Sequence, residues 1–201
     1  MRIMQKIGFA LGVLCFSAGV AAAQSQGEVR IDFDPATTKV EFTLSDVLHT
    51  VHGAFRLKSG SMHFDPATGA AGGALVVDVA SGDSGNKTRD RKMDKEILET
   101  EKYPEATFTP KQVIGHLAME GSSQVQVQGT FRLHGADHEI TLSVPAQVNG
   151  NQVQMQTTLQ IPFVRWGMKD PSTFVLRVNK EVQMNISGTE KISSGAQPTS
   201  H

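Results

Sequence analysis

Apolar and polar residues alternate with a period of two along most of this chain. In the stretch 124–133 the odd-numbered residues are Val, Gly, Phe and Leu, whereas the even-numbered ones are Gln, Thr and Arg, and the stretch 152–161 largely repeats this pattern. Successive side chains of a β-strand point to opposite faces, so both stretches predict strands with one buried face. The same parity predicts further strands at 29–33, 40–44, 51–57, 75–79, 140–144, 174–178 and 182–186.

Turn-forming residues separate the predicted strands. Asp, Asn, Gly and Pro cluster at 34–37, 65–69, 135–137, 149–151 and 178–181. Short connections of this kind join antiparallel neighbours, and one apolar face per strand favours a sheet that curls around that face. The pattern therefore predicts an all-β, antiparallel domain of about eight strands, closed as a barrel or folded as a sandwich.

The segment 88–99 departs from the alternation. It contains helix-forming, mostly charged residues, with Met93 and Ile97 four positions apart and Leu98 beside them. This spacing places the three apolar side chains on one side of a helix. We expect a short helix that lies over one end of the sheet, with its charged residues in solvent.

The first 23 residues have the features of a cleaved signal peptide. Arg2 and Lys6 precede an apolar stretch at 7–20, and Ala21-Ala22-Ala23 forms a cleavage site. The apolar stretch is shorter than the roughly 20 residues of a membrane-spanning helix. We therefore expect export to the periplasm without stable membrane insertion, a folded domain at 24–189, and a flexible polar tail at 190–201.

Cysteine and charge content limit the function further. The single cysteine, Cys15, lies in the predicted signal peptide, so the mature chain would have neither a disulfide nor a cysteine-based metal site. The formal net charge is −1, from 19 basic and 20 acidic residues, and this balance does not predict a nucleic-acid partner.

Two groups of residues are candidates for chemistry. The sequence Gly82-Asp83-Ser84-Gly85 is similar to the nucleophile loop of chymotrypsin-like proteases, but Asn86 follows where a glycine is needed. His134 and His138 flank a predicted turn, and Asp137 would complete a metal site or, with His134, an acid–base pair at the barrel mouth. Ordinary solvated turn residues explain the same pattern, and we expect neither a catalytic residue nor a metal.

Most of the mature chain resembles the YceI-like family of periplasmic lipid-binding proteins. The resemblance covers 26–187 and depends on the order and spacing of several short motifs, each of which is a strand with a turn. These motifs are Asp34-Pro35, Val40-Glu41-Phe42, Gly53-Ala54-Phe55, Gly60-Ser61-Met62, Arg89-Asp90, Tyr103-Pro104-Glu105-Ala106-Thr107-Phe108, the stretch 127–135, and Trp166-Gly167-Met168. The sequence differs from the usual family pattern at Lys92, where histidine is common, and at Ile97-Leu98, where a phenylalanine pair is usual.

The resemblance implies an extended, lipocalin-like antiparallel β-barrel that encloses an isoprenoid lipid or quinone. It implies a non-enzymatic carrier or store without a cofactor, whose only partner besides a possible second copy is this apolar ligand. Strand parity and the apolar positions of the helix select the expected ligand-binding residues, which are Val40, Phe42, Phe55, Leu75, Val77, Met93, Leu98, Phe108, Val127, Phe131, Leu142 and Met155.

Two alternatives remain open from the sequence. The inward-facing phenylalanines would equally fill a solid core, which is the usual state of a protein interior and would make the domain a structural or interaction module. An enzyme that acts on an amphiphilic substrate at the barrel mouth is the other alternative. Trp166 and Tyr103 each combine a ring with a polar atom and are suited to the rim of a cavity or to a structural anchor.

Overall fold

The computed structural model describes residues 27–45, 49–173 and 177–195. The predicted signal peptide lies outside these residues, as do 174–176 of the strand that the sequence predicts at 174–178. Val178, the end of that predicted strand, forms only an isolated bridge.

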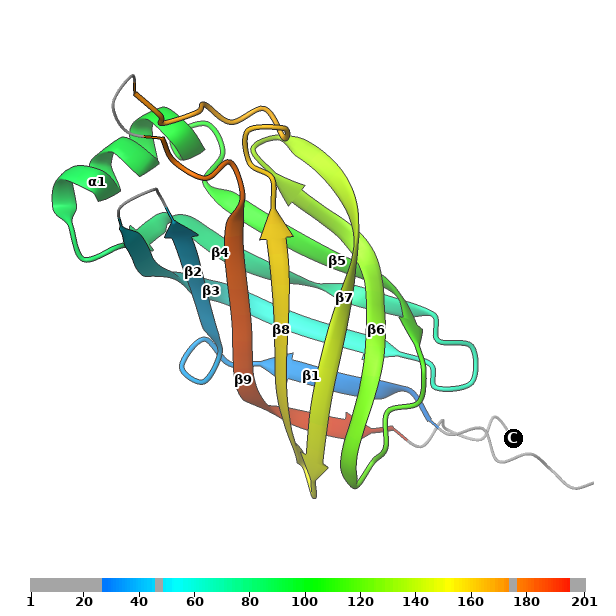
Figure 1. The fold of residues 1–201 in the computed structure, drawn as a ribbon. Helices are drawn as coiled ribbons and strands as arrows, with labels where there is room; N and C mark the ends of the chain where they lie inside the picture. Colours follow the sequence, from blue (N-terminus) through cyan, green and yellow to red (C-terminus); the bar gives the residue numbers. More distant parts are fainter. Residues whose placement is uncertain (1–26, 46–48, 174–176, 196–201) are drawn as a thin grey trace, which may run out of the picture.

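Within the described residues, nine antiparallel strands form a single closed sheet (Figure 1). The order β1-β3-β2-β9-β8-β7-β6-β5-β4 is completed by pairing of β3 with β4 and of β1 with β9, which confirms the predicted all-β antiparallel barrel. The strands are β1 (Val29–Phe33), β2 (Lys39–Ser45), β3 (Thr50–Phe64), β4 (Ala71–Asp83), β5 (Glu105–Ile114), β6 (Gly121–Leu133), β7 (Ala136–Asn149), β8 (Gln152–Ile161) and β9 (Val182–Ser194).

The nine strands occupy eight positions around the barrel wall. β1 and β2 both pair with β3 on one side and with β9 on the other, because β1 faces the 60–64 end of β3 and β2 faces its 50–55 end. They are therefore two halves of one wall position, interrupted by the loop 34–38. The prediction of an eight-stranded barrel is thus confirmed.

A buried carboxylate fastens the loop that divides β1 from β2. The Glu190 side chain is 2 % exposed and accepts hydrogen bonds from the Asp34 N–H (2.8 Å), from Thr37 Oγ1 (3.1 Å) and from Thr38 Oγ1 (2.7 Å). Glu190 lies within β9, and the strand continues to Ser194. The predicted boundary at 190 was wrong, because a polar residue that the sequence places in a flexible tail is held in the barrel by these three donors.

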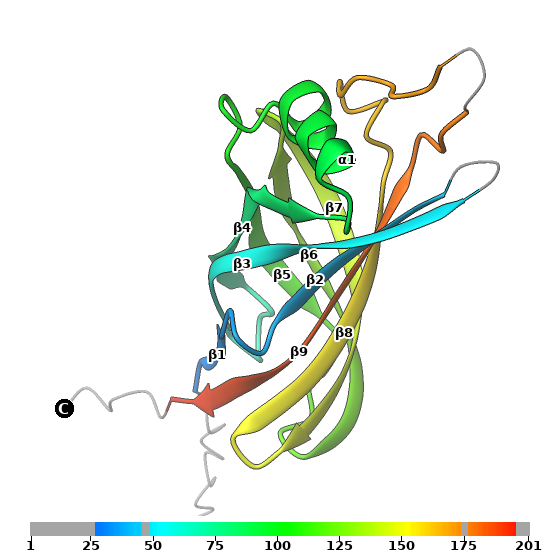
Figure 2. The same cartoon turned by 90° about the vertical axis from the view of Figure 1, so that its left-hand side faces the viewer.

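A short helical segment lies over one end of the barrel, as predicted for 88–99 (Figure 2). It consists of α1 (Lys87–Lys92) followed by one π-helical stretch, η1 (Met93–Leu98). Asn86 caps α1, with its side-chain oxygen accepting from the Thr88 and Arg89 N–H groups. Among the described residues no helix is long and apolar enough to cross a membrane.

The opposite end of the barrel is closed by tightly packed aliphatic side chains. Val148 and Val153, which face each other beside the β7–β8 hairpin, are 0 % exposed, and they pack with Val29 and Ile192 near the start of β1 and the end of β9. We call these four residues the closed end. The end covered by α1 and η1 is called the mouth.

Candidate functional site

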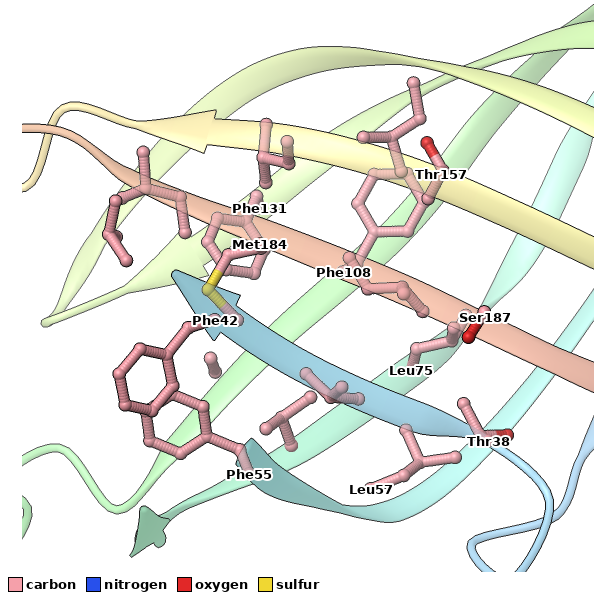
Figure 3. A pocket seen from close by; sticks show the side chains of 18 of the residues that line it. Thr38, Phe42, Phe55, Leu57, Leu75, Phe108, Phe131, Thr157, Met184 and Ser187 are labelled. Atoms are coloured by element: carbon pink, nitrogen blue, oxygen red, sulfur yellow. The ribbon is translucent and has the colours of Figure 1, made fainter. Parts of the chain in front are cut away.

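The barrel encloses an apolar cavity of about 480 Å³. All nine strands contribute side chains to its wall, and Met93, Ile97 and Leu98 of η1 contribute from the mouth. Figure 3 shows Phe42, Phe55, Phe108 and Phe131 among the lining residues. The interior is therefore hollow over part of its length, and the solid-core alternative does not fit.

The structure brings all twelve residues selected from the sequence into the wall of this one cavity. Ten of them come from inward-facing strand positions, and Met93 and Leu98 come from apolar positions of η1. The twelve are Val40, Phe42, Phe55, Leu75, Val77, Met93, Leu98, Phe108, Val127, Phe131, Leu142 and Met155.

Polar groups in the cavity wall largely form hydrogen bonds with other groups of the protein. Thr38, which lines the cavity, donates to Glu190, and the Thr157 hydroxyl donates to the Ser143 carbonyl oxygen (2.9 Å). A hydroxyl that already has a protein partner offers little to a polar ligand group. The cavity is thus suited to hydrocarbon, which needs shape and apolar surface rather than hydrogen bonds.

At the mouth, Ser84 and Asp90 anchor the helical segment to β4. Asp90 Oδ1 accepts from the Ser84 N–H (2.9 Å) and hydroxyl (2.5 Å), and Arg89 donates from Nε to Ser84 Oγ (2.8 Å) and from Nη2 to the Ser84 carbonyl (2.7 Å). The hydrogen bond from the Ser84 hydroxyl lowers the pKa of Asp90 and keeps it ionised. Ser84 is therefore a structural residue, which explains the protease-like sequence 82–85.

The candidate histidine site does not form. His134 Nε2 lies 2.7 Å from Glu99 Oε2 and its ring packs on Tyr103, whereas Asp137 binds Arg132 Nε at 2.7 Å. His134 and Gly135 make a two-residue turn with φ angles of 51° and 77°, so the turn begins one residue earlier than the predicted 135–137 and is one residue shorter. Within the described residues no three His, Cys, Asp or Glu side chains converge on a metal position.

His138 instead stacks on Trp166 at the rim of the barrel. The two rings are nearly parallel, with an interplanar angle of 7° and centroids 3.7 Å apart, and the ring of Phe131 lies tilted by 48° with its centroid 6.1 Å from that of Trp166. Burial lowers the pKa of His138 and favours its neutral form. Trp166 and Tyr103 both lie near the mouth, where the sequence placed them, but neither side chain lines the cavity.

Sequence reasoning missed several lining residues. Phe163 and Met168 come from the turn after β8, where no alternation marks the inward side. Thr157 continues the inward parity of Met155 and Leu159 and was detectable by position, but its polar side chain hid it. Glu190 gave no signal, because its partners lie more than 150 residues away in the chain.

Comparison with known proteins gives a consistent result. The profile of the YceI-like domain matches residues 31–189. A UPF0312 protein of Yersinia enterocolitica is 30% identical over 148 residues, which is 72% of this chain and 73% of the relative. A UPF0312 protein of Yersinia pestis is 28% identical over the same shares.

Two solved structures share the fold. A polyisoprenoid-binding domain from Saccharophagus degradans, implicated in plant cell wall breakdown, superposes with a TM-score of 0.63 at 20% identity, covering 82% of this chain and 98% of that one. Burkholderia cenocepacia BcnA superposes with a TM-score of 0.65 at 23% identity, covering 81% of this chain and 99% of that one. At these identities the likeness establishes the architecture.

Proposed function

This chain belongs to the YceI-like family, and from that membership and the apolar cavity we propose that it binds the hydrocarbon chain of a polyisoprenoid lipid or isoprenoid quinone inside the barrel. It acts as a periplasmic carrier or store. The observation that carries the proposal is the cavity itself, whose wall is built from aliphatic and phenylalanine side chains of every strand.

The physical basis of binding is burial of apolar surface. Each methylene group transferred from water into the cavity contributes about 0.8 kcal/mol, so several isoprene units give tight binding without any ionic contact. The extended chain also suits a cavity that runs from η1 at the mouth down to Val153 at the closed end. The similarity of the fold to the polyisoprenoid-binding domain from Saccharophagus degradans supports this ligand class.

The contacts of the titratable groups favour a carrier over an enzyme. Glu190 accepts three hydrogen bonds from the 34–38 loop, and Arg89 binds Ser84, so both are occupied structurally. His134 and Asp137, the pair on which an enzyme at the mouth would depend, have separate partners. An acid or base must reach the reacting group, and these four do not point to one position.

A displacement titration tests the proposal. Nile red, whose fluorescence rises in apolar surroundings, is bound first and then displaced by farnesol, by geranylgeraniol or by a short-chain ubiquinone. We expect saturable dye binding and displacement that strengthens with chain length. An absence of saturable binding by the wild-type protein would refute the carrier function.

Two neighbouring substitutions provide a matched pair. Leu142 points into the cavity, and Thr141 is exposed on the outer face of the same strand. Leu142→Glu should reduce dye affinity at least a hundredfold, because an unpaired carboxylate in an apolar site disfavours hydrocarbon. Thr141→Glu should leave affinity unchanged. Circular dichroism confirms that both variants are folded.

A further inference from the structure

The barrel wall has a seam at which two neighbouring strands separate. Only four residue pairs join β7 to β8, and the last of them is Ala146–Met155, although both strands continue beyond it and lie wholly within the described residues. In Figure 1, β7 curves away from β8 above their shared hairpin. We call the facing segments 136–145 and 156–161 the β7–β8 gap.

Pro145 explains where the pairing ends. The register between β7 and β6 passes through Pro145 without a shift, whereas the register with β8 stops at the residue after it. Proline has no backbone N–H, so the ladder with β8 loses a donor at this position. The next contact across the gap is the bond from the Thr157 hydroxyl to the Ser143 carbonyl, in which a side chain replaces a backbone donor.

The cavity reaches the gap from inside. Leu142 and Val144 of β7 line it on one side, and Thr157 and Leu159 of β8 line it on the other. Gln156, at the start of the gap, belongs to the cavity lining although it is exposed to solvent. Side chains rather than a backbone ladder therefore separate the cavity from solvent along this seam.

The outer face beside the gap is uncharged over 141–145 of β7 and 156–160 of β8, whereas the exposed Asp137 and Glu139 at its wide end are paired with Arg132 and Lys111. The exposed polar residues of the uncharged part are amides and hydroxyl groups, namely Thr141, Ser143, Gln156, Thr158 and Gln160. A hydrocarbon chain that crosses the wall between 141–145 and 156–160 passes no charged group on these two strands and therefore removes water from none.

The wide end of the gap is bridged by the stack of Trp166 on His138. Trp166 belongs to the turn that follows β8, and His138 lies near the start of β7, so the two rings join the strands that the ladder leaves apart. The turn is itself ordered by hydrogen bonds from Trp166 N–H to the Pro162 carbonyl and from Met168 N–H to the Phe163 carbonyl.

The mouth is held more firmly than the gap. Displacing α1 and η1 breaks the hydrogen bonds of Ser84 with Asp90 and Arg89 and the ion pair between Lys169 and Glu96. Several of these involve charged groups, which form the stronger hydrogen bonds. Among the described residues, widening the gap breaks the neutral bond from the Thr157 hydroxyl and the stack of Trp166 on His138.

We propose that the β7–β8 gap is the lateral doorway through which an apolar chain enters and leaves the barrel, and that Trp166 stacked on His138 is its latch. This inference rests on the proposed function. Neither latch side chain lines the cavity, although Trp166 packs near Phe131, which does; breaking the stack therefore changes the barrier to passage more than it changes the bound state.

Stopped-flow exchange of all-trans-retinol, a fluorescent isoprenoid alcohol, tests the doorway. Trp166→Ala and His138→Ala should each accelerate both association and dissociation at least tenfold, with a Kd within threefold of the wild type. Pro145→Val, which restores a backbone N–H at an exposed position, should slow both rates at least threefold. Because Pro145→Val should change the exchange rates in the opposite direction, it distinguishes a doorway from a general loosening of the fold.

Tyr103→Ala is the matched control. Tyr103 packs against His134 at the same end of the barrel, with the rings tilted by 50° and their centroids 4.4 Å apart, but this pair does not bridge the gap and does not line the cavity. Its exchange rates should equal those of the wild type, and circular dichroism verifies that each variant is folded.

Three results would overturn the doorway. These are unchanged rates in both latch variants, an equal acceleration in Tyr103→Ala, or a weaker Kd that arises from faster dissociation alone, which would make Trp166 a ligand contact. A wild-type protein that binds no retinol and no Nile red refutes the proposed function instead, so the two failures are distinguishable.

Discussion

The closed end and the mouth of this barrel are built from the same inward-facing strand parity, yet they pack differently. At the closed end Val148 and Val153 are completely buried, and Ile192 is 3 % exposed. Near the mouth the inward side chains of Val51 and Phe55 are only half-buried and face the cavity. Alternation therefore determines which side is inside, and the pairing of the strands determines whether that inside is filled.

Irregular pairing near the mouth explains the difference. The β3–β4 register shifts between Ala54 and Arg56, where the Ser81 hydroxyl accepts the Arg56 N–H (2.7 Å) in place of a regular ladder bond. On the other side of the barrel, β7 and β8 separate after Ala146. Bulges and separations of this kind bend strands and widen the space between opposite walls. At the closed end the pairs from Ala146–Met155 to Asn149–Gln152 run without a shift.

The largest expected effect on stability is at the closed end. Ile192→Ala should lower the free energy of unfolding by about 2–5 kcal/mol, because it opens a void among packed side chains. Nile red affinity should stay within threefold, since Ile192 does not line the cavity. Urea denaturation measures the first quantity and fluorescence titration the second. Lys191→Ala, at the exposed neighbouring position, is the control; an equal loss in both variants would contradict the assignment.

Glu190 should have the next largest effect. Glu190→Ala leaves the Asp34 N–H and two threonine hydroxyls without their acceptor, and hydrogen bonds to charged groups contribute about 1.5–3 kcal/mol each. We expect a loss of about 3 kcal/mol in urea denaturation, and a smaller loss for Glu190→Gln, which keeps the shape and one acceptor oxygen. A loss in Glu190→Ala with no loss in Glu190→Gln would show that packing rather than the full set of hydrogen bonds matters here.

A truncation at the mouth should affect ligand affinity more than stability, which is the reverse of the effect expected at the closed end. Leu98→Ala removes a half-buried side chain that lines the cavity, so the free energy of unfolding should fall by less than about 1 kcal/mol. Farnesol affinity should fall roughly tenfold, which corresponds to about 1.4 kcal/mol of lost contact. A variant that is strongly destabilised but binds normally would place Leu98 in the core instead.

The smallest expected effect is the pH dependence that His138 contributes. Its pKa is lowered by burial, so the folded state binds this proton more weakly than the unfolded state does. Its contribution to stability is complete above the ordinary histidine pKa of about 6.5 and declines as the pH falls from there to the lowered pKa. Titration by NMR should find His138 below 6.5, and His138→Ala should remove this part of the slope. A pKa above 6.5 would contradict the buried stack.

Strand parity was sufficient to find the cavity wall because a period of two assigns every residue of a strand to a face. Phe108 and Leu142 were identified in this way without knowledge of their partners. Parity carries no information on register, so the β7–β8 gap could not be predicted, although Pro145 is visible in the sequence. Contacts between distant segments were equally hidden, as the buried position of Glu190 and the stack of His138 on Trp166 illustrate. The hollow interior was implied by the family resemblance, since the same residues would also make a solid core.

The most direct test of the account is to identify what the barrel contains. The protein is purified from its native host, extracted with organic solvent and analysed by mass spectrometry, with the Leu142→Glu variant extracted in parallel. We predict a polyisoprenoid or isoprenoid quinone in the wild-type extract at a constant ratio to protein, and its loss from the variant. A wild-type extract that consistently contains no lipid would contradict the claim that this cavity holds an apolar chain.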